Sequence, residues 1–154
     1  MKKHFTTYEI ALKLKKLGFN EPCFKYFCDG EIRNFYKINQ QGCEIADFEE
    51  CTNNEIDLEY EEYSFPEDDA ELGIKYSEPC SAPLWGQAID WLEDEYLILI
   101  QTEYNITHNF WHHFICPYEK DFGHIDEHGF KNRYEAREKA ILKAIELINL
   151  NRIK

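Results

Sequence analysis

A chain of 154 residues in which 44% are hydrophobic and 16% aromatic can fill a sizeable core, and this composition excludes a wholly disordered protein. The formal net charge of −13 disfavours direct binding to the phosphates of a nucleic acid. The longest aliphatic run, residues 97–100, is far too short to span a lipid bilayer.

The first predicted element is a short amphipathic helix over residues 7–17. Thr6 and Glu9 have the spacing of a capping box, in which two side chains bind free amide groups at the start of a helix. Apolar residues then recur at helical spacing as far as Gly18, a favourable residue at a helix C-terminus.

A β-hairpin is predicted next. Residues 23–28 and 31–38 are rich in aromatic residues, which favour strands. Asp29-Gly30 lies between the two runs and is a typical hairpin turn.

The cysteines and the N-terminal residues bear on the cellular compartment. None of the six cysteines forms a Cys-x-x-Cys pair, so the usual zinc-ribbon spacing is absent. The first lysines are not followed by the apolar run of an export signal. We therefore expect free thiols and a cytoplasmic protein, in the cytoplasm of a bacterial host.

Residues 44–78 carry the net charge of the chain. They contain 14 acidic residues and one lysine, and the charges of all other residues sum to zero. Acidic and apolar residues alternate over 55–61, and a period of two predicts a half-buried strand. One face of this strand would carry four carboxylates, those of Glu55, Asp57, Glu59 and Glu61.

Such a row of carboxylates would resemble the charged edge of DNA. Same-face residues of a strand repeat every ~6.7 Å, which is about half the charge density of one DNA strand. The following loop would add the carboxylates of Glu67, Asp68 and Asp69. We expect this surface to engage a basic surface of a host protein. The alternative is a solvated strand face that protects a sheet edge from aggregation.

In the C-terminal half, the sequence predicts a helix, then the strands of a sheet, and then a second helix. The elements are a helix, two strands, a short third strand and a second helix, over residues 82–95, 96–103, 110–116, 123–130 and 133–150. Asn132 and Glu135 supply a box-like cap for the last helix.

Together these elements predict an α+β fold. An antiparallel sheet carries two longer helices on one face, and a short N-terminal helix and a hairpin are added to it. We expect a single α+β domain over residues 1–154. Its parts are the helix and hairpin, an acidic insertion or strand-loop segment, and a helix-strand-strand-(strand)-helix unit, over residues 1–43, 44–79 and 80–154.

One local cluster has the chemistry of a metal site. His124, Asp126 and His128 share a face if residues 122–130 are extended, and mixed imidazole and carboxylate ligation suits a transition metal. On a straight strand the outer two are ~13 Å apart, so only a bent backbone would let them converge. A small metal-dependent hydrolase or nuclease is the alternative function. Three preceding histidines are interpreted as strand and core residues: His108, His112 and His113.

Three segments resemble a recurrent family of small proteins from phages and mobile elements of Bacteroidetes: residues 18–24, 82–92 and 134–141. The resemblance covers residues 5–30 and 80–150. It implies a host-cytoplasm setting and an accessory role, and it assigns no functional residues.

The sequence thus predicts a small acidic accessory protein of the phage type that acts by binding. It would be an inhibitor whose DNA-like carboxylate surface contacts a basic host defence or nucleic-acid-binding protein. We expect no catalytic residue, no cofactor, no direct contact with nucleic acid and no membrane association. A homodimer, or a homo-oligomeric structural role, is left open.

Overall fold

The computed structural model describes residues 2–34, 37–38, 44–45, 50–62, 78–118 and 124–150. Contacts divide the chain into two compact units. The C-terminal unit consists of Lys3–Thr6 and the chain from Leu84 onward, and the N-terminal unit is Thr7–Pro83. That the two form a single domain stays a prediction. No helix within the described ranges is long and apolar enough to cross a membrane.

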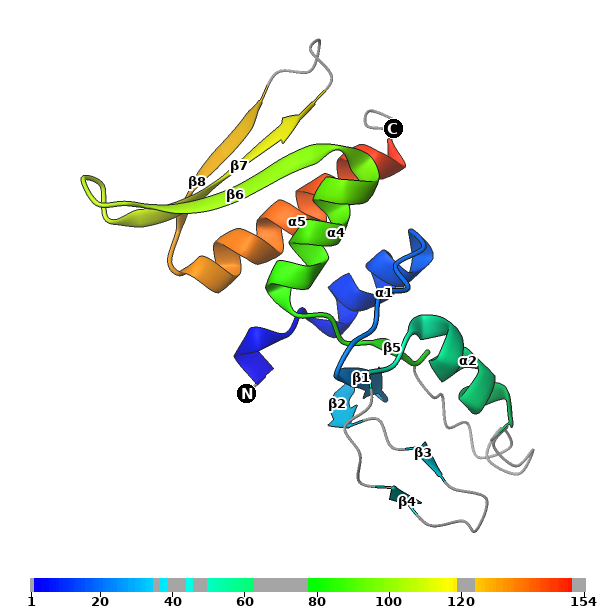
Figure 1. The fold of residues 1–154 in the computed structure, drawn as a ribbon. Coiled ribbons are helices and arrows are strands. Elements are labelled where there is room, and N and C mark those ends of the chain that lie inside the picture. Colours follow the sequence, from blue (N-terminus) through cyan, green and yellow to red (C-terminus); the bar gives the residue numbers. More distant parts are fainter. Residues whose placement is uncertain are drawn as a thin grey trace, which may run out of the picture. The chain divides into compact units, whose positions relative to one another are not determined.

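The C-terminal unit is built on a three-stranded antiparallel sheet with the order β6-β7-β8. Its elements are α4 (Trp85–Tyr96), β6 (Ile98–Asn105), β7 (Phe110–Pro117), β8 (Ile125–Phe130) and α5 (Arg133–Asn149). Both helices pack on the same face of the sheet (Figure 1). The predicted α+β fold, with two longer helices on one face of an antiparallel sheet, is confirmed.

Local sequence explains how these two helices join the sheet. Asn132 accepts a hydrogen bond from the amide of Glu135 at 3.0 Å, and Glu135 accepts one from the amide of Lys131 at 2.9 Å. The predicted cap of α5 is therefore confirmed. Helix α4 ends at Leu97, whose left-handed backbone (φ 50°) turns the chain directly into β6.

The core of the C-terminal unit lies between the sheet and the two helices. Ile98, Ile100 and Ile115 are buried on the face of the sheet that the helices cover. Helix α5 contributes small buried residues at four-residue spacing, Ala136, Ala140 and Ala144. Each buried isoleucine stabilises the fold by roughly 2 kcal/mol, so this layer holds the sheet against the helices.

The N-terminal unit contains two small antiparallel sheets, with the orders β2-β1-β5 and β3-β4. Its elements are α1 (Tyr8–Lys16), β1 (Lys25–Cys28), β2 (Glu31–Asn34), β3 (Lys37–Ile38), β4 (Glu44–Ile45), α2 (Asn53–Glu62) and β5 (Cys80–Ser81). A short 3-10 helix, η1 (Lys2–His4), precedes them, and its residues Lys3 and His4 belong to the C-terminal unit. The predicted start of α4 at residue 82 is wrong, because strand β5 pairs with β1 and the helix begins only at Trp85.

The predicted N-terminal helix and hairpin are confirmed. The N-cap of α1 is Thr7, not Thr6, since the side chain of Thr7 accepts a hydrogen bond from the first turn at 3.4 Å. Strands β1 and β2 are joined by Asp29 and Gly30, with φ angles of 51° and 72°, as a tight hairpin turn requires. The structure assigns two shorter strands, β2 and β3, to the predicted second strand of the hairpin.

Residues 55–61, predicted as a strand, belong to the α-helix α2. A capping box starts this helix: the amide of Thr52 donates to Oε2 of Glu55 at 2.8 Å, and the amide of Glu55 donates to the hydroxyl of Thr52 at 3.3 Å. Ile56, which is 3% exposed, packs with Cys51 in a small buried cluster. An alternating pattern this short is compatible with a strand or a helix, and the capping box favours the helix.

Candidate functional site

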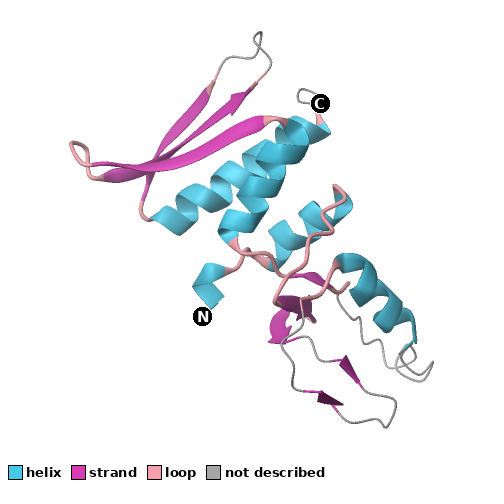
Figure 2. Cartoon of the chain, viewed as in Figure 1, coloured by secondary structure: helices cyan, strands magenta, loops and turns pink. Residues whose placement is uncertain are grey.

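The β6-β7-β8 sheet has one covered face and one open face. Helices α4 and α5 lie on the covered face, and among the described residues of the C-terminal unit no helix lies on the other (Figure 2). Along β7, strand alternation turns His113 and Ile115 toward the helices, where both are fully buried. His112 and Phe114 are half-buried and belong to the other side, which we call the open face.

A β-bulge at Gly129 separates the two ends of β8 onto different faces of the sheet. In the pairing of β7 with β8, Trp111 is opposite Phe130 and His112 is opposite His128, so the register skips Gly129. Gly129 has a φ of +95°, a conformation that favours glycine. His128 lies on the open face together with Asp126 by regular alternation. Because Gly129 is skipped, Phe130, two positions after His128, lies on the covered face.

His112 lies between carboxylates of two neighbouring strands. Glu103 of β6, His112 of β7 and His128 of β8 are directly opposite one another across the sheet. Nδ1 of His112 is 3.2 Å from Oδ1 of Asp126, and its Nε2 is 3.9 Å from Oε2 of Glu103. The side chain of His112 is 23% exposed, whereas those of Asp126 and Glu103 are 47% and 66% exposed.

Three rings stack beside this imidazole. The ring centroid of Phe110 is 5.9 Å from that of His108, with 13° between the planes. It is 5.6 Å from that of His128, with 28° between the planes. The β6–β7 turn positions His108, whose amide donates a hydrogen bond to Oδ1 of Asn105 at 3.1 Å. The turn and two strands therefore bring three nearly parallel rings together.

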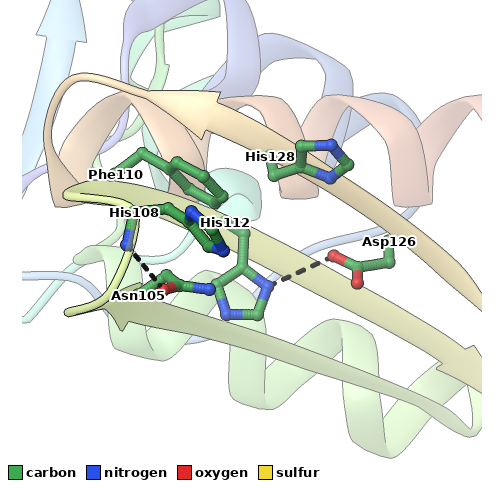
Figure 3. Close-up of a pocket in the computed structure, with 6 residues that line it drawn as sticks. All are labelled: Asn105, His108, Phe110, His112, Asp126 and His128. Atoms are coloured by element: carbon green, nitrogen blue, oxygen red, sulfur yellow. Dashed lines mark hydrogen bonds and ion pairs between the residues drawn. The ribbon is translucent and has the colours of Figure 1, made fainter.

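These side chains surround an open pocket of about 360 Å³ (Figure 3), which is lined by Asn105, His108, Phe110, His112, Asp126 and His128. The pocket offers ring faces for stacking, together with an amide, a carboxylate and three imidazoles for polar contacts. Its six lining residues carry no hydroxyl or thiol group. These side chains are suited to stacking and to polar contacts with a bound group.

The acidic residues predicted to contact a partner do not form a row. Successive positions of a helix are about 100° apart, so residues two apart in α2 do not share a face as they would in a strand. The carboxylate of Glu55 is used in the cap at Thr52, and that of Asp57 is 2.6 Å from Nζ of Lys15. Glu59 and Glu61 lie further along α2, whereas Glu67, Asp68 and Asp69 lie outside the described residues.

Lys15 holds part of the acidic segment inside the N-terminal unit. Its Nζ is 2.6 Å from Asp57 and 3.3 Å from Glu78, and it donates a hydrogen bond to the carbonyl of Pro79 at 2.9 Å. Burial alone would lower the pKa of Lys15, but the two carboxylates outweigh burial and raise it. These acids connect α1 with α2 and with the chain before β5. The predicted strand of outward carboxylates is therefore not formed.

The three residues of the predicted metal alternative do not form one cluster. His124 stacks on Phe114, with ring centroids 5.2 Å apart, whereas Asp126 and His128 belong to the pocket. Within the ranges that the structure describes, no group of three or more His, Cys, Asp or Glu side chains is placed to hold a metal ion. The convergence that a metal-dependent hydrolase needs is not found there.

Strand period places Asp126 and His128 on one face and does the same for His108 and His112, but it does not bring the two pairs together. The interpretation of the preceding histidines as strand and core residues is confirmed for His112 and His113, which lie in β7, and for His113 also by its burial. It is wrong for His108, which lies in the β6–β7 turn. The interpretation did not include the pocket, which both His108 and His112 line. Strand period separates the two consecutive histidines and is a signal that the sequence contains. The pairing of three strands and the bulge, which complete the pocket, have no such local signal.

Comparisons of the chain with protein-family models, with curated proteins and with solved structures found no match. The resemblance to small proteins of phages and mobile elements therefore stays a prediction. Fold and pocket together define an α+β protein with an open sheet face lined by rings.

Proposed function

We propose that this chain is a small acidic accessory protein that acts by binding a basic surface of a host protein. Its contact surface would be the open face of the β6-β7-β8 sheet. The observation that carries the proposal is the pocket on this face, where a stack of rings lies beside carboxylates from two strands. Aromatic side chains at the centre and polar groups around them are typical of protein interfaces.

The net charge of −13 supports a basic partner. A strongly acidic protein attracts a basic one over roughly a Debye length, about 8 Å at physiological salt, and this attraction accelerates association. The acidic segment contributes to the attraction even though two of its carboxylates are engaged within the N-terminal unit. A partner that binds nucleic acid has such a basic surface, and occupying that surface would make this protein an inhibitor.

The exposure of the open face also supports contact with a macromolecule. Phe110, His112 and Phe114 are half-buried along the central strand of the sheet. An aromatic sheet face that stays uncovered leaves apolar surface in water, and a partner that covers the face removes this surface from water.

Site-specific photo-cross-linking tests the contact surface directly. Gln101 is exposed on the open face, directly opposite Phe114. A photoreactive amino acid at Gln101 should form adducts with a basic host protein, and their yield should fall as the salt concentration rises. The same amino acid at Asp90, which is exposed on α4, is the matched control and should give few adducts.

Two results would contradict this proposal. Equal adduct yields from Gln101 and Asp90 would show that the open face is not the contact surface. An adduct yield that does not change with ionic strength would contradict the proposed electrostatic attraction to the partner. If Gln101 cross-links only to a second copy of the chain, and light scattering shows an oligomer, the homo-oligomeric alternative replaces it.

A further inference from the structure

We propose that the open-face pocket binds the guanidinium group of an arginine side chain, an inference that rests on the proposed binding of a basic protein. The pocket combines two features that the guanidinium group satisfies at once. One is a set of nearly parallel rings from the β6–β7 turn, β7 and β8. The other is negative charge on two strands with no lysine or arginine among the six lining residues.

The rings favour a planar ligand. The planes of His108 and His128 are within 13° and 28° of the plane of Phe110. A guanidinium group is planar and delocalised, and it stacks on aromatic faces with an additional attraction between its charge and the ring. The ammonium group of a lysine is a compact point charge and gains less from such a surface.

The carboxylates favour a cation. Asp126 contacts His112 through Oδ1, and among the described residues no lysine or arginine forms an ion pair with Asp126 or Glu103. A carboxylate offers about four acceptor positions, so Asp126 can accept the two parallel N–H donors of a guanidinium group while it keeps its contact with His112. Glu103, on the other side of His112, adds a second negative charge.

The same two features disfavour other ligands. The carboxylates repel phosphate and other anions. A neutral nucleobase would stack on the rings but leave the charges unused, and a lysine would use the charges but gain little from the rings. Arginine uses both and is enriched among the residues that dominate binding energy at protein interfaces.

A titration of the full-length protein, followed by NMR, tests the inference without a host protein. The probes are two peptides of equal charge, acetyl-Gly-Arg-Gly-amide and acetyl-Gly-Lys-Gly-amide. The arginine peptide should produce saturable shifts in the side-chain signals of Phe110 and His128. The lysine peptide should bind at least roughly fivefold more weakly than the arginine peptide, because it lacks the stacking contribution.

Variants assign the binding to the pocket. Asp126→Asn should weaken binding of the arginine peptide about tenfold, since a charge-assisted pair is lost. Asp90→Asn removes the same charge from the exposed surface of α4 and should leave binding unchanged. Phe110→Leu keeps an apolar side chain but removes the ring, and it should also weaken binding. Glu103→Gln is a second charge variant, since it leaves the contact between Asp126 and His112 intact.

Several outcomes would overturn the inference. They are equal binding of the two peptides, binding that neither Phe110→Leu nor the two charge variants weaken, and tighter binding of adenosine than of the arginine peptide. Failure here is distinguishable from failure of the proposed function. If cross-linking from Gln101 succeeds and the peptide does not bind, only the arginine inference is lost. If the peptide binds and Gln101 gives no salt-sensitive adduct, the inference that the pocket binds arginine stands, and the proposal of a basic host protein as the partner is contradicted.

Discussion

His112 and His113 are consecutive residues that lie on opposite faces of one sheet. His112 belongs to the open face, where carboxylate oxygens are 3.2 Å and 3.9 Å from its ring nitrogens. The side chain of His113 is 0% exposed, and its ring stacks on Phe130 with centroids 5.2 Å apart. One strand therefore supplies one imidazole to the candidate site and the next to the core.

The buried imidazole should make stability depend on pH. Burial lowers the pKa of His113 from its ordinary value of 6.5, and Glu127, 3.8 Å from Nε2, offsets only part of this effect. The unfolded chain therefore takes up a proton at His113 at a higher pH than the folded chain does. The stability contributed by neutral His113 is present in full well above pH 6.5, and it is lost progressively as the pH falls below this value.

His113→Phe should reduce this loss, because phenylalanine keeps a ring against Phe130 and cannot be protonated. Urea unfolding at about pH 7.5 and pH 5.5 gives the loss for the wild type and the variant. His124→Phe is the matched control, since His124 is exposed. Between the two pH values this variant should lose as much stability as the wild type does. A His113→Phe variant that loses as much stability as the wild type would assign the pH dependence to other groups.

Gly129→Ala should destabilise the sheet and disturb the pocket. Gly129 has a φ of +95°, and no atom lies within 4 Å of the place that a Cβ would take. The cost therefore comes from the backbone alone, about 1 kcal/mol, and relief of this strain would move His128 away from Phe110. Thermal unfolding measures the first effect, and NOE contacts between the two rings report the second.

Gly86→Ala is the control for this substitution. Gly86 lies in α4, has no positive φ and has equally free space around it, so alanine should not lower stability there. If the two substitutions have equal effects, the bulge does not depend on the left-handed backbone of Gly129.

The thiol of Cys80 should not react in the folded protein. Burial raises the pKa of Cys80 to about 12, and the residue is 0% exposed. Iodoacetamide at about pH 8 should therefore alkylate the half-buried Cys116 first and Cys80 only after unfolding. Peptide mapping by mass spectrometry measures both rates in one sample. Equal rates in the folded protein would contradict the burial of Cys80.

Elements with long or chemically distinct signals were predictable from the sequence. The helices of the C-terminal unit show apolar periodicity over several turns. Asn132 is a residue type that favours a helix N-cap, and Asp29-Gly30 is a pair that favours a tight hairpin turn. The pattern over residues 55–61 is only seven residues long, and so short a pattern is compatible with strand and helix alike.

The capping box at Thr52 and Glu55 was the stronger signal in that segment, because it satisfies two backbone amides at once. The pocket is a different case. His112 meets Asp126 and His128 only through the pairing of β7 with β8, in which the residue after His128, Gly129, is skipped. A pattern read along one strand contains neither the pairing nor the bulge.

Asn53→Ala should destabilise the N-terminal unit, because Asn53 fixes the start of α2 to two other segments. Its side chain is buried: Nδ2 donates to the carbonyl of Phe19 at 2.6 Å, and Oδ1 accepts from the amide of Ser81 at 2.8 Å. Alanine would leave both backbone groups without these partners, at a cost of about 2–4 kcal/mol. Urea unfolding measures this cost, and hydrogen exchange of the α2 amides should accelerate in the variant.

Asn54→Ala provides a matched control one residue away. Asn54 is exposed, and its backbone amide, not its side chain, donates to Oδ1 of Asn20 at 2.9 Å. Alanine keeps this bond, so the substitution should change stability by no more than about 0.5 kcal/mol. Equal losses in the two variants would mean that the side chain of Asn53 does not anchor α2. The assignment of residues 53–62 to a helix fixed by its first turn would then have to be revised.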